Sequence, residues 1–320
     1  MRARAPAVIV GILLAAGAAR SGEPSAHGLL DRMNDAVRML DYEGRFVVQA
    51  GDQMDAMYIV HRVVGGSEKE RVVSLTGQPR EIIRSDEAVA CLVPGRERPI
   101  NVGRPAQGRS FSPLSGVSAE QLEASYRMQV LAPGRVAGRD AYQVLVEPQD
   151  DLRYGYRLFI DQASALPLRT VTFDDAMRVV SQTMFVELKT DGPITPIERD
   201  LSAMQLARAE PAEPLAQERL APPGWTFEAT PPGFQLAVHR RRALAGGRGE
   251  LEHFIFSDGL ASVSVYIQPH EGKDALVGES SMGAANMVGR LLDDHEVVAV
   301  GEVPVKTLHW FAQHAQAARR

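Results

Sequence analysis

Short strand-like runs, each followed by turn residues, recur at intervals of about ten residues, and this spacing constrains the fold more than any other feature. Regular short strands with tight turns are typical of an antiparallel meander rather than of βαβ units. We therefore expect one long, curved antiparallel sheet. Its runs include "KERVVSLTG", "REIIRSD", "EAVACLVPG", "RDAYQVLVEP", "YGYRLFIDQ", "LPLRTVTFDD" and "MRVVSQTMFVELKT".

Two helices are expected to accompany the sheet. Over residues 27–40, apolar side chains recur at the spacing of one helical face, with charged residues elsewhere on the surface. The pair Ser118 and Gln121 forms a capping-box signature, which predicts a short helix over 118–126.

The first hairpin of the sheet, residues 42–64, is apolar on both faces. A hairpin with one face in water should alternate cleanly between apolar and polar residues. The apolar residues are Phe46, Val48, Met57 and Ile59 on one face, and Val47, Tyr58 and Val60 on the other. The pattern leaves open whether the chain itself, a partner protein or a lipid covers the second face.

The strand pattern stops at residues 191–224, which are rich in proline, alanine and charge and read as a linker. A second series of runs follows from Trp225, and a final helix is expected to open at Pro304. The chain is thus predicted to be α+β: one long, curved antiparallel sheet with packed helices at 25–195, a linker at 196–222, and a smaller α+β domain at 223–320.

The first 19 residues read as a secretory signal peptide, with Arg2 and Arg4 ahead of a short apolar stretch and a small-residue cleavage site. No cysteine follows this segment to accept a lipid. The chain has one cysteine, Cys91, so an exported form cannot close an internal disulfide. The strand setting of Cys91 favours a small buried apolar residue over a nucleophile.

Patterns for catalysis, cofactors and nucleic acid are missing from the sequence. The net charge of −5 gives no general attraction to DNA or RNA. The eight histidines show no metal-ligand spacing, and no phosphate-binding loop, dinucleotide fingerprint or nucleophile elbow occurs. Three aspartate pairs, at 150–151, 174–175 and 293–294, fall between strand runs, where aspartate is a turn former. No metal, cofactor or catalytic residue is therefore predicted.

Two features stand out as candidate binding sites. The first is an apolar cavity on the concave side of the sheet, suited to a lipid, unless the two helices fill it. Its candidate residues are Phe46, Val48, Met57, Ile59, Tyr156, Leu158 and Ile160.

The second feature is the arginine-rich run "HRRRALAGGR". It is either an ordinary solvated hairpin or a site for an acidic protein segment or an anionic headgroup. Consecutive arginines on a strand alternate between its faces, so they need not form one patch. The candidate residues are Arg240, Arg241, Arg242 and Arg248.

With these residues in view, the chain resembles the MucB/RseB family of exported regulators of the envelope-stress sigma factor. The resemblance covers nearly the whole mature chain, and its motifs occur in the family's order and spacing. They are "YEGRFVVQ", "MYIVHR", "REIIR", "RVAGRDAYQV", "RYGYRLFIDQASALPLR", "FSDGLASVSVYIQP" and "VVAVGEVP".

The resemblance implies a periplasmic protein whose first domain is a large antiparallel half-barrel similar to lipoprotein carriers of the LolA type, joined to a smaller C-terminal domain. It also implies binding to the periplasmic segment of a membrane-spanning anti-sigma factor, protection of that segment from the initiating protease, and release by lipid or lipopolysaccharide. A periplasmic lipid or lipoprotein carrier is the alternative, and an exported hydrolase is the weakest reading. The oligomeric state, a homo-oligomer included, stays open.

The linker generates the first testable prediction. Limited proteolysis of the folded chain should cut first within residues 191–224, because an exposed segment without strand pattern is the preferred substrate. Fragment masses by mass spectrometry identify the site. Protection of this whole segment, with cutting inside 155–160 instead, would show a single fused domain.

Overall fold

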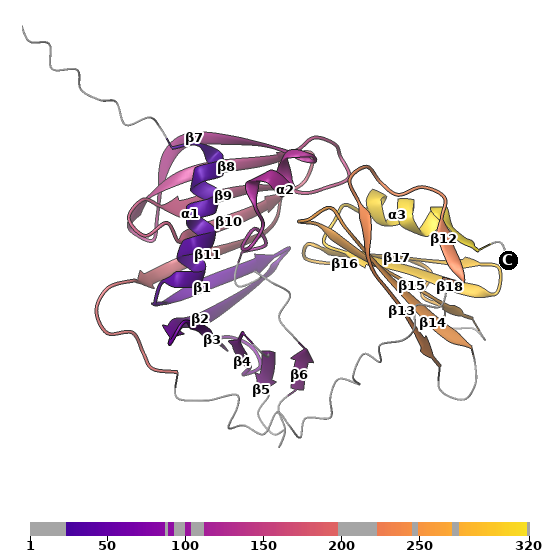
Figure 1. Ribbon diagram of the computed structural model, residues 1–320, viewed down its shortest axis with the longest axis horizontal. Coiled ribbons are helices and arrows are strands. Elements are labelled where there is room, and N and C mark those ends of the chain that lie inside the picture. Colours follow the sequence, from indigo (N-terminus) through magenta and orange to yellow (C-terminus); the bar gives the residue numbers. More distant parts are fainter. Residues whose placement is uncertain are drawn as a thin grey trace, which may run out of the picture.

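The computed structural model (Figure 1) describes residues 24–86, 89–92, 100–103, 112–197, 223–244, 249–270 and 275–318. The predicted signal peptide at 1–19, Arg248, and the predicted linker after Ile197 lie outside these residues.

The first domain is one open antiparallel sheet, which confirms the predicted half-barrel. Eleven strands follow the order β6-β5-β4-β3-β2-β1-β11-β10-β9-β8-β7. Neighbours in the sheet are neighbours in the chain except at the centre, where β1 pairs with β11 and joins the two halves. The strands are β1 Tyr42–Ala50, β2 Gln53–Val64, β3 Ser67–Ser74, β4 Glu81–Ser85, β5 Val89–Leu92, β6 Ile100–Gly103, β7 Tyr126–Val136, β8 Arg139–Pro148, β9 Gly155–Asp161, β10 Pro167–Phe173 and β11 Val179–Lys189.

Strand β7 is not among the predicted strands, because Pro133 and Gly134 interrupt its pattern. A proline cannot donate a hydrogen bond to a neighbouring strand and is confined to edges and bulges. Strand β7 meets both conditions, since it forms an edge of the sheet and its register with β8 shifts between Leu131 and Gly134. Because β7 is an edge strand, it can contain Pro133, a residue whose presence in a sequence normally argues against a strand.

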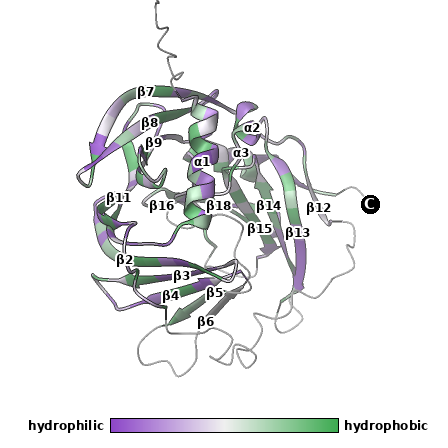
Figure 2. Cartoon of the chain, turned by 60° about the vertical axis from the view of Figure 1, so that its left-hand side comes forward, coloured by the Kyte–Doolittle hydropathy of each residue, from purple (hydrophilic) through white to green (hydrophobic). Residues whose placement is uncertain are grey.

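Both predicted helices of the first domain are confirmed, and they fill its concave face. Helix α1 (Ala26–Met39) begins at the N-cap Ser25, whose Oγ accepts a hydrogen bond from Gly28 N at 3.1 Å. Helix α2 (Ala119–Glu123) has the predicted capping box between Ser118 and Gln121. In Figure 1, α1 lies across strands β7–β11, and Figure 2 shows that it carries both hydrophobic and hydrophilic residues. Its buried side chains join the sheet in two apolar clusters: the first half of α1 packs with α2, and Ala36 and Val37 pack with Phe46 and Ile59 of the first hairpin.

The chain itself covers the second face of the first hairpin. A two-residue turn at 51–52 links β1 to β2, and Gly51 has a φ of 63°, as such turns require. On the outer face, Tyr58 Oη and Thr195 N both donate to the Glu43 carboxylate, at 2.9 and 3.0 Å. The segment after β11 thus folds back on this face, where Ile194 is buried and Val60, opposite Glu43 in the β1–β2 pairing, is 0% exposed.

The second domain is a six-stranded antiparallel sheet with one helix, which confirms the predicted α+β unit. The sheet order is β13-β14-β15-β18-β17-β16, and β12 pairs with β19 in a separate ribbon. Helix α3 (Val305–His314) begins one residue later than predicted, with Pro304 at its N-cap. The strands are β12 Trp225–Phe227, β13 Gln235–Ala243, β14 Glu250–Ser257, β15 Ser262–Pro269, β16 Gly278–Met282, β17 Ala285–Leu292, β18 His295–Gly301 and β19 Ala315–Ala317.

Strict alternation along β14 and β15 gives the second sheet one buried and one open face. Phe254, Phe256, Val263 and Val265 are at most 3% exposed and pack with Phe311 of α3. The residues between them, such as Ser264, are only partly buried and point to the opposite face. This opposite face of β15 borders the first domain, and the candidate site lies there.

Candidate functional site

A buried arginine joins the two domains. Arg153 lies on the loop between β8 and β9 and is 1% exposed. Its Nε lies 2.5 Å from the carboxylate of Asp258 in the second domain, and its other nitrogens donate to Asp150 and to the carbonyl of Pro232. The guanidinium also lies over the ring of Phe234, 4.8 Å from its centroid. One side chain of the first domain thus binds three groups of the second.

The charge of Arg153 is fully compensated in this site. Burial by itself lowers the pKa of the guanidinium, but hydrogen bonds and charge interactions with Asp258 and Asp150 outweigh it, so the pKa of Arg153 is raised. The arginine fork presents several N–H donors at once, and here three of its nitrogens each donate to a different group, which suits it to a buried contact of this kind.

Residues beside Arg153 continue the contact between the domains. Leu152 O accepts a hydrogen bond from Thr307 Oγ1 at 2.6 Å, and Tyr154 Oη accepts one from Asn286 Nδ2 at 2.8 Å. Leu260 of the second domain is 3% exposed and belongs to the apolar core of the first. The contact therefore has an ionic centre, a polar surround and a shared apolar residue.

The aspartate pairs predicted as turns are turns, and two of them bind the second domain. Lys306 Nζ at the start of α3 lies 2.7 Å from Asp151 and 3.1 Å from Asp175. The lysine lowers the pKa of the Asp151 carboxyl. These carboxylates thus hold a cation of α3 instead of forming an acid pair.

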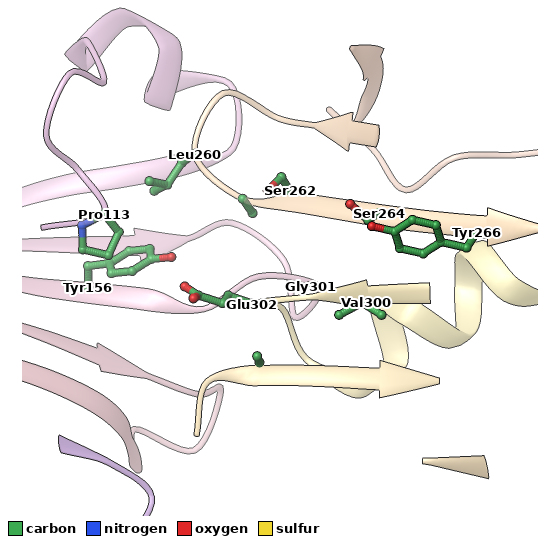
Figure 3. A pocket seen from close by; sticks show the side chains of 11 residues that line it. Pro113, Tyr156, Leu260, Ser262, Ser264, Tyr266, Val300, Gly301 and Glu302 are labelled. Atoms are coloured by element: carbon green, nitrogen blue, oxygen red, sulfur yellow. The ribbon is translucent and has the colours of Figure 1, made fainter. Parts of the chain in front are cut away.

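An open cavity of about 420 Å³ lies beside this contact, between the domains. Figure 3 shows the hydroxyl groups of Tyr156 and Tyr266 and the carboxylate of Glu302 around it. The first domain supplies Pro113 and Tyr156, and the second supplies Leu260, Ala261, Ser262, Ser264, Tyr266, Ala285, Val300, Gly301 and Glu302. Both domains thus build its walls.

The seven residues predicted to line an apolar cavity lie mostly inside the first domain's core. Side chains of α1, of α2 and of residues 112–117 pack against this face of the sheet. Of the seven, Phe46, Ile59, Tyr156, Leu158 and Ile160 are buried, and Val48 and Met57 are partly buried against them. Tyr156 is the one of the seven that also borders the interdomain cavity. A lipid site at these residues stays a prediction.

The predicted arginines separate into two groups. Arg240 and Arg242 are exposed, whereas Arg241 points to the other face of β13 and pairs with Glu250 at 2.6 Å and with the buried Glu252 at 3.4 Å. Arg248 lies outside the described residues, and binding of a partner or headgroup by the other three stays a prediction.

Glu252 explains the position of Arg241. Its carboxylate accepts hydrogen bonds from Gly224 N at 2.9 Å and from His239 Nε2 at 2.9 Å. These two hydrogen bonds, with the ion pair to Arg241, fix the start of the second domain against β13 and β14. Arg241 is therefore part of this internal network and is less available to a partner than Arg240 or Arg242.

Neither a metal centre nor a membrane span is seen in the part of the chain that the structure describes. No three His, Cys, Asp or Glu side chains there are grouped to hold a metal ion, and no described helix is long and apolar enough to cross a bilayer. Cys91 is free and only partly buried, which corrects the expectation of a fully buried residue. Sequence reasoning missed Arg153 and Glu302, because a single charged residue in a turn carries no pattern.

Arg153 can be tested by stability measurements. Arg153→Met leaves the carboxylate of Asp258, which is 0% exposed, without its cation, and we expect the free energy of unfolding to fall by about 3–5 kcal/mol. The control is Arg178→Met, whose 79% exposed side chain pairs with Asp174 and should change the urea midpoint far less, because water screens an exposed ion pair. Equal urea midpoints for the two variants would show that Arg153 contributes no special stability.

Comparisons with known proteins agree with this architecture. The family model of the MucB/RseB N-terminal domain matches residues 25–209, and that of the MucB/RseB C-terminal domain matches residues 219–316. The chain is 29% identical to the sigma factor AlgU regulatory protein MucB of Pseudomonas aeruginosa, over 96% of this chain and 95% of that protein. It is 23% identical to the sigma-E factor regulatory protein RseB of Escherichia coli, over 97% and 96% of the two chains.

Solved structures extend the likeness to the arrangement of the whole chain. A crystal structure of MucB in complex with MucA(peri) superimposes with a TM-score of 0.69 at 25% identity, covering 92% of this chain and 99% of that chain. A complex structure of Pseudomonas aeruginosa MucA/MucB gives a TM-score of 0.70 at 26% identity, with the same coverage. With both of its domains matched by the family models, the chain belongs to the MucB/RseB family.

Proposed function

We propose that this chain is a periplasmic regulator that binds the periplasmic segment of a membrane-spanning anti-sigma factor. The observation that carries the proposal is the match of both domains to MucB structures solved with MucA. The predicted signal peptide supports the periplasmic location. A binding role without catalysis agrees with the regulatory names of its relatives.

The geometry supports recognition of an extended polypeptide. The open face of the second sheet, around Ser264 and Tyr266, borders the first domain at the cavity. Arg153 and Lys306 fix the two domains to each other there, so a bound segment meets a surface that is already organised. Pre-organisation lowers the entropy that binding must overcome. A protease needs an accessible, extended substrate, so a segment buried on this surface is protected.

Release by a lipid or lipopolysaccharide is the second part of the proposal. The concave face of the first domain is occupied by its own side chains, among them Leu114, which is 0% exposed. The segment around Leu114 is attached to α1 by Asn34, which donates to Val117 O at 2.8 Å and accepts from Gly116 N at 2.9 Å. An acyl chain would take the place of such side chains, and its binding would therefore change the surface beside the domain contact.

Binding and protection can be measured with purified components. We expect the mature chain to retain the periplasmic segment of the cognate anti-sigma factor in a pull-down and to slow its cleavage by the initiating protease. The control is a segment of identical composition in scrambled order. Retention of neither segment, or of both equally, would contradict the proposed function.

The lipid signal should act through linkage. Lipopolysaccharide added to the preformed complex is expected to weaken partner affinity about tenfold, equivalent to about 1.4 kcal/mol of coupling, and the partner must weaken lipid binding equally. Fluorescence anisotropy of the labelled segment measures the affinity. Unchanged affinity at saturating lipid rules out the switch and leaves the alternative of a lipid carrier.

The exposed arginines can be examined in the same titration. Arg240→Ala with Arg242→Ala should reduce the response if these residues bind anionic headgroups, while Arg241 is kept because of its internal ion pairs. Arg80→Ala with Arg127→Ala makes the same charge change at exposed positions of the first domain. A response equal in the two double variants would remove the arginine hairpin from the mechanism.

A further inference from the structure

The interdomain cavity has hydrogen-bonding groups that the chain does not use. Within the described residues, no hydrogen bond or ion pair is formed by the side chains of Ser262, Ser264 or Glu302. Glu302 is exposed at the end of β18. Asn286 donates to the carbonyl of the next residue, Val303, at 2.8 Å and to Tyr154 Oη of the first domain at 2.8 Å. The backbone next to Glu302 is therefore held at the domain contact, while its carboxylate oxygens remain open to a ligand.

The lining favours a ligand that donates hydrogen bonds and carries positive charge. A carboxylate only accepts hydrogen bonds, and hydroxyl groups both donate and accept. None of the 11 lining residues is basic, and Glu302 is the charged one. Apolar walls are supplied by Pro113, Leu260 and Val300. An anionic headgroup would find no cation here, whereas an organic cation on an apolar stem meets complementary groups at both ends.

The cations nearest the cavity are already neutralised. Arg153 is paired with Asp150 and Asp258, and Lys306 with Asp151 and Asp175. The ring of His253 stacks on Tyr266 with centroids 4.2 Å apart. Burial and the charge of Arg240 lower the pKa of His253, so this imidazole is neutral near pH 7 and adds no positive charge behind Tyr266. Glu302 thus keeps an uncompensated negative charge.

We propose that this cavity receives a lysine or arginine side chain of the bound polypeptide, with its cation at Glu302 and its methylene stem against Pro113, Leu260 and Val300. The inference rests on the proposed function, and it specifies which type of partner side chain enters this cavity. Long basic side chains pack their stems on apolar surface while the charged end finds acceptors. Since Tyr156 belongs to the first domain and Glu302 to the second, one inserted side chain would contact both domains.

The test uses the full mature chain and the periplasmic segment of the cognate anti-sigma factor. Glu302→Gln removes the charge and keeps the shape, and we expect it to weaken binding about tenfold, with a smaller loss at high salt. Glu228→Gln is the matched control, because Glu228 is also exposed in the second domain but lies beside His314, at the far end of α3 from Glu302. It should leave the affinity unchanged.

The partner side is tested by changing each lysine and arginine of the segment to glutamine in turn. One of these changes should weaken binding to the unmodified chain, and combining it with Glu302→Gln should add little further loss, as a double-mutant cycle requires for a direct pair. Ser264→Lys, which places a cation in the cavity from within, should produce the same loss as Glu302→Gln.

The outcomes separate this inference from the proposed function. Failure of the unmodified chain to bind the segment contradicts both. Binding that is equal for the unmodified chain and Glu302→Gln, with no partner residue coupled to position 302, overturns only the cavity's role. Spermidine and glucosamine serve as probes of a different source of the cation. If either probe binds and its binding depends on Glu302, while no partner residue is coupled to Glu302, then the occupant of the cavity is not the polypeptide.

Discussion

The buried guanidinium of Arg153 is the interaction on which the arrangement of this chain depends. A charge removed from water is unfavourable by several kcal/mol unless its partners are well placed. Arg153 meets that requirement with two carboxylates, a carbonyl and an aromatic ring, and three of these four come from the second domain. The need to satisfy these charges therefore favours one way for the domains to meet, because an alternative docking would leave Asp258 without its cation and Arg153 with Asp150 as its carboxylate partner.

This ionic contact also determines where a binding site can exist. The concave face of the half-barrel is occupied by α1, α2 and residues 112–117, so its apolar residues stabilise the first domain. The open space of about 420 Å³ lies instead beside Arg153, where each domain supplies part of the wall. A regulator that recognises a polypeptide gains from this location, because partner affinity then depends on the state of the contact between its domains.

Such a dependence offers a physical route for a signal. The proposed lipid site in the first domain and the proposed polypeptide site between the domains involve different residues, and a coupling between them requires an element that both ligands affect. Pro113 borders the cavity, and its neighbour Leu114 lies in the core that an acyl chain would disturb. The segment 112–117 thus connects the two proposed ligands through direct packing.

The local elements of this protein could be read from its sequence, whereas its contacts between distant residues could not. Turn spacing predicted the antiparallel sheet, the Ser118 and Gln121 pair predicted α2, and family motifs predicted the half-barrel and the regulatory role, because each signal depends on residues close in the chain. Strand β7 was missed, since Pro133 is compatible with a strand only at an edge, and an edge is a property of the assembled sheet. The tertiary structure likewise decided three further features. They are the burial of Val60 on the face that the segment after β11 folds onto, the internal ion pairs that set Arg241 apart from the exposed Arg240 and Arg242, and the pairing of Arg153 with Asp258. Arg153 and Asp258 are 105 positions apart, and no local pattern records which buried charge will meet which partner once the domains pack.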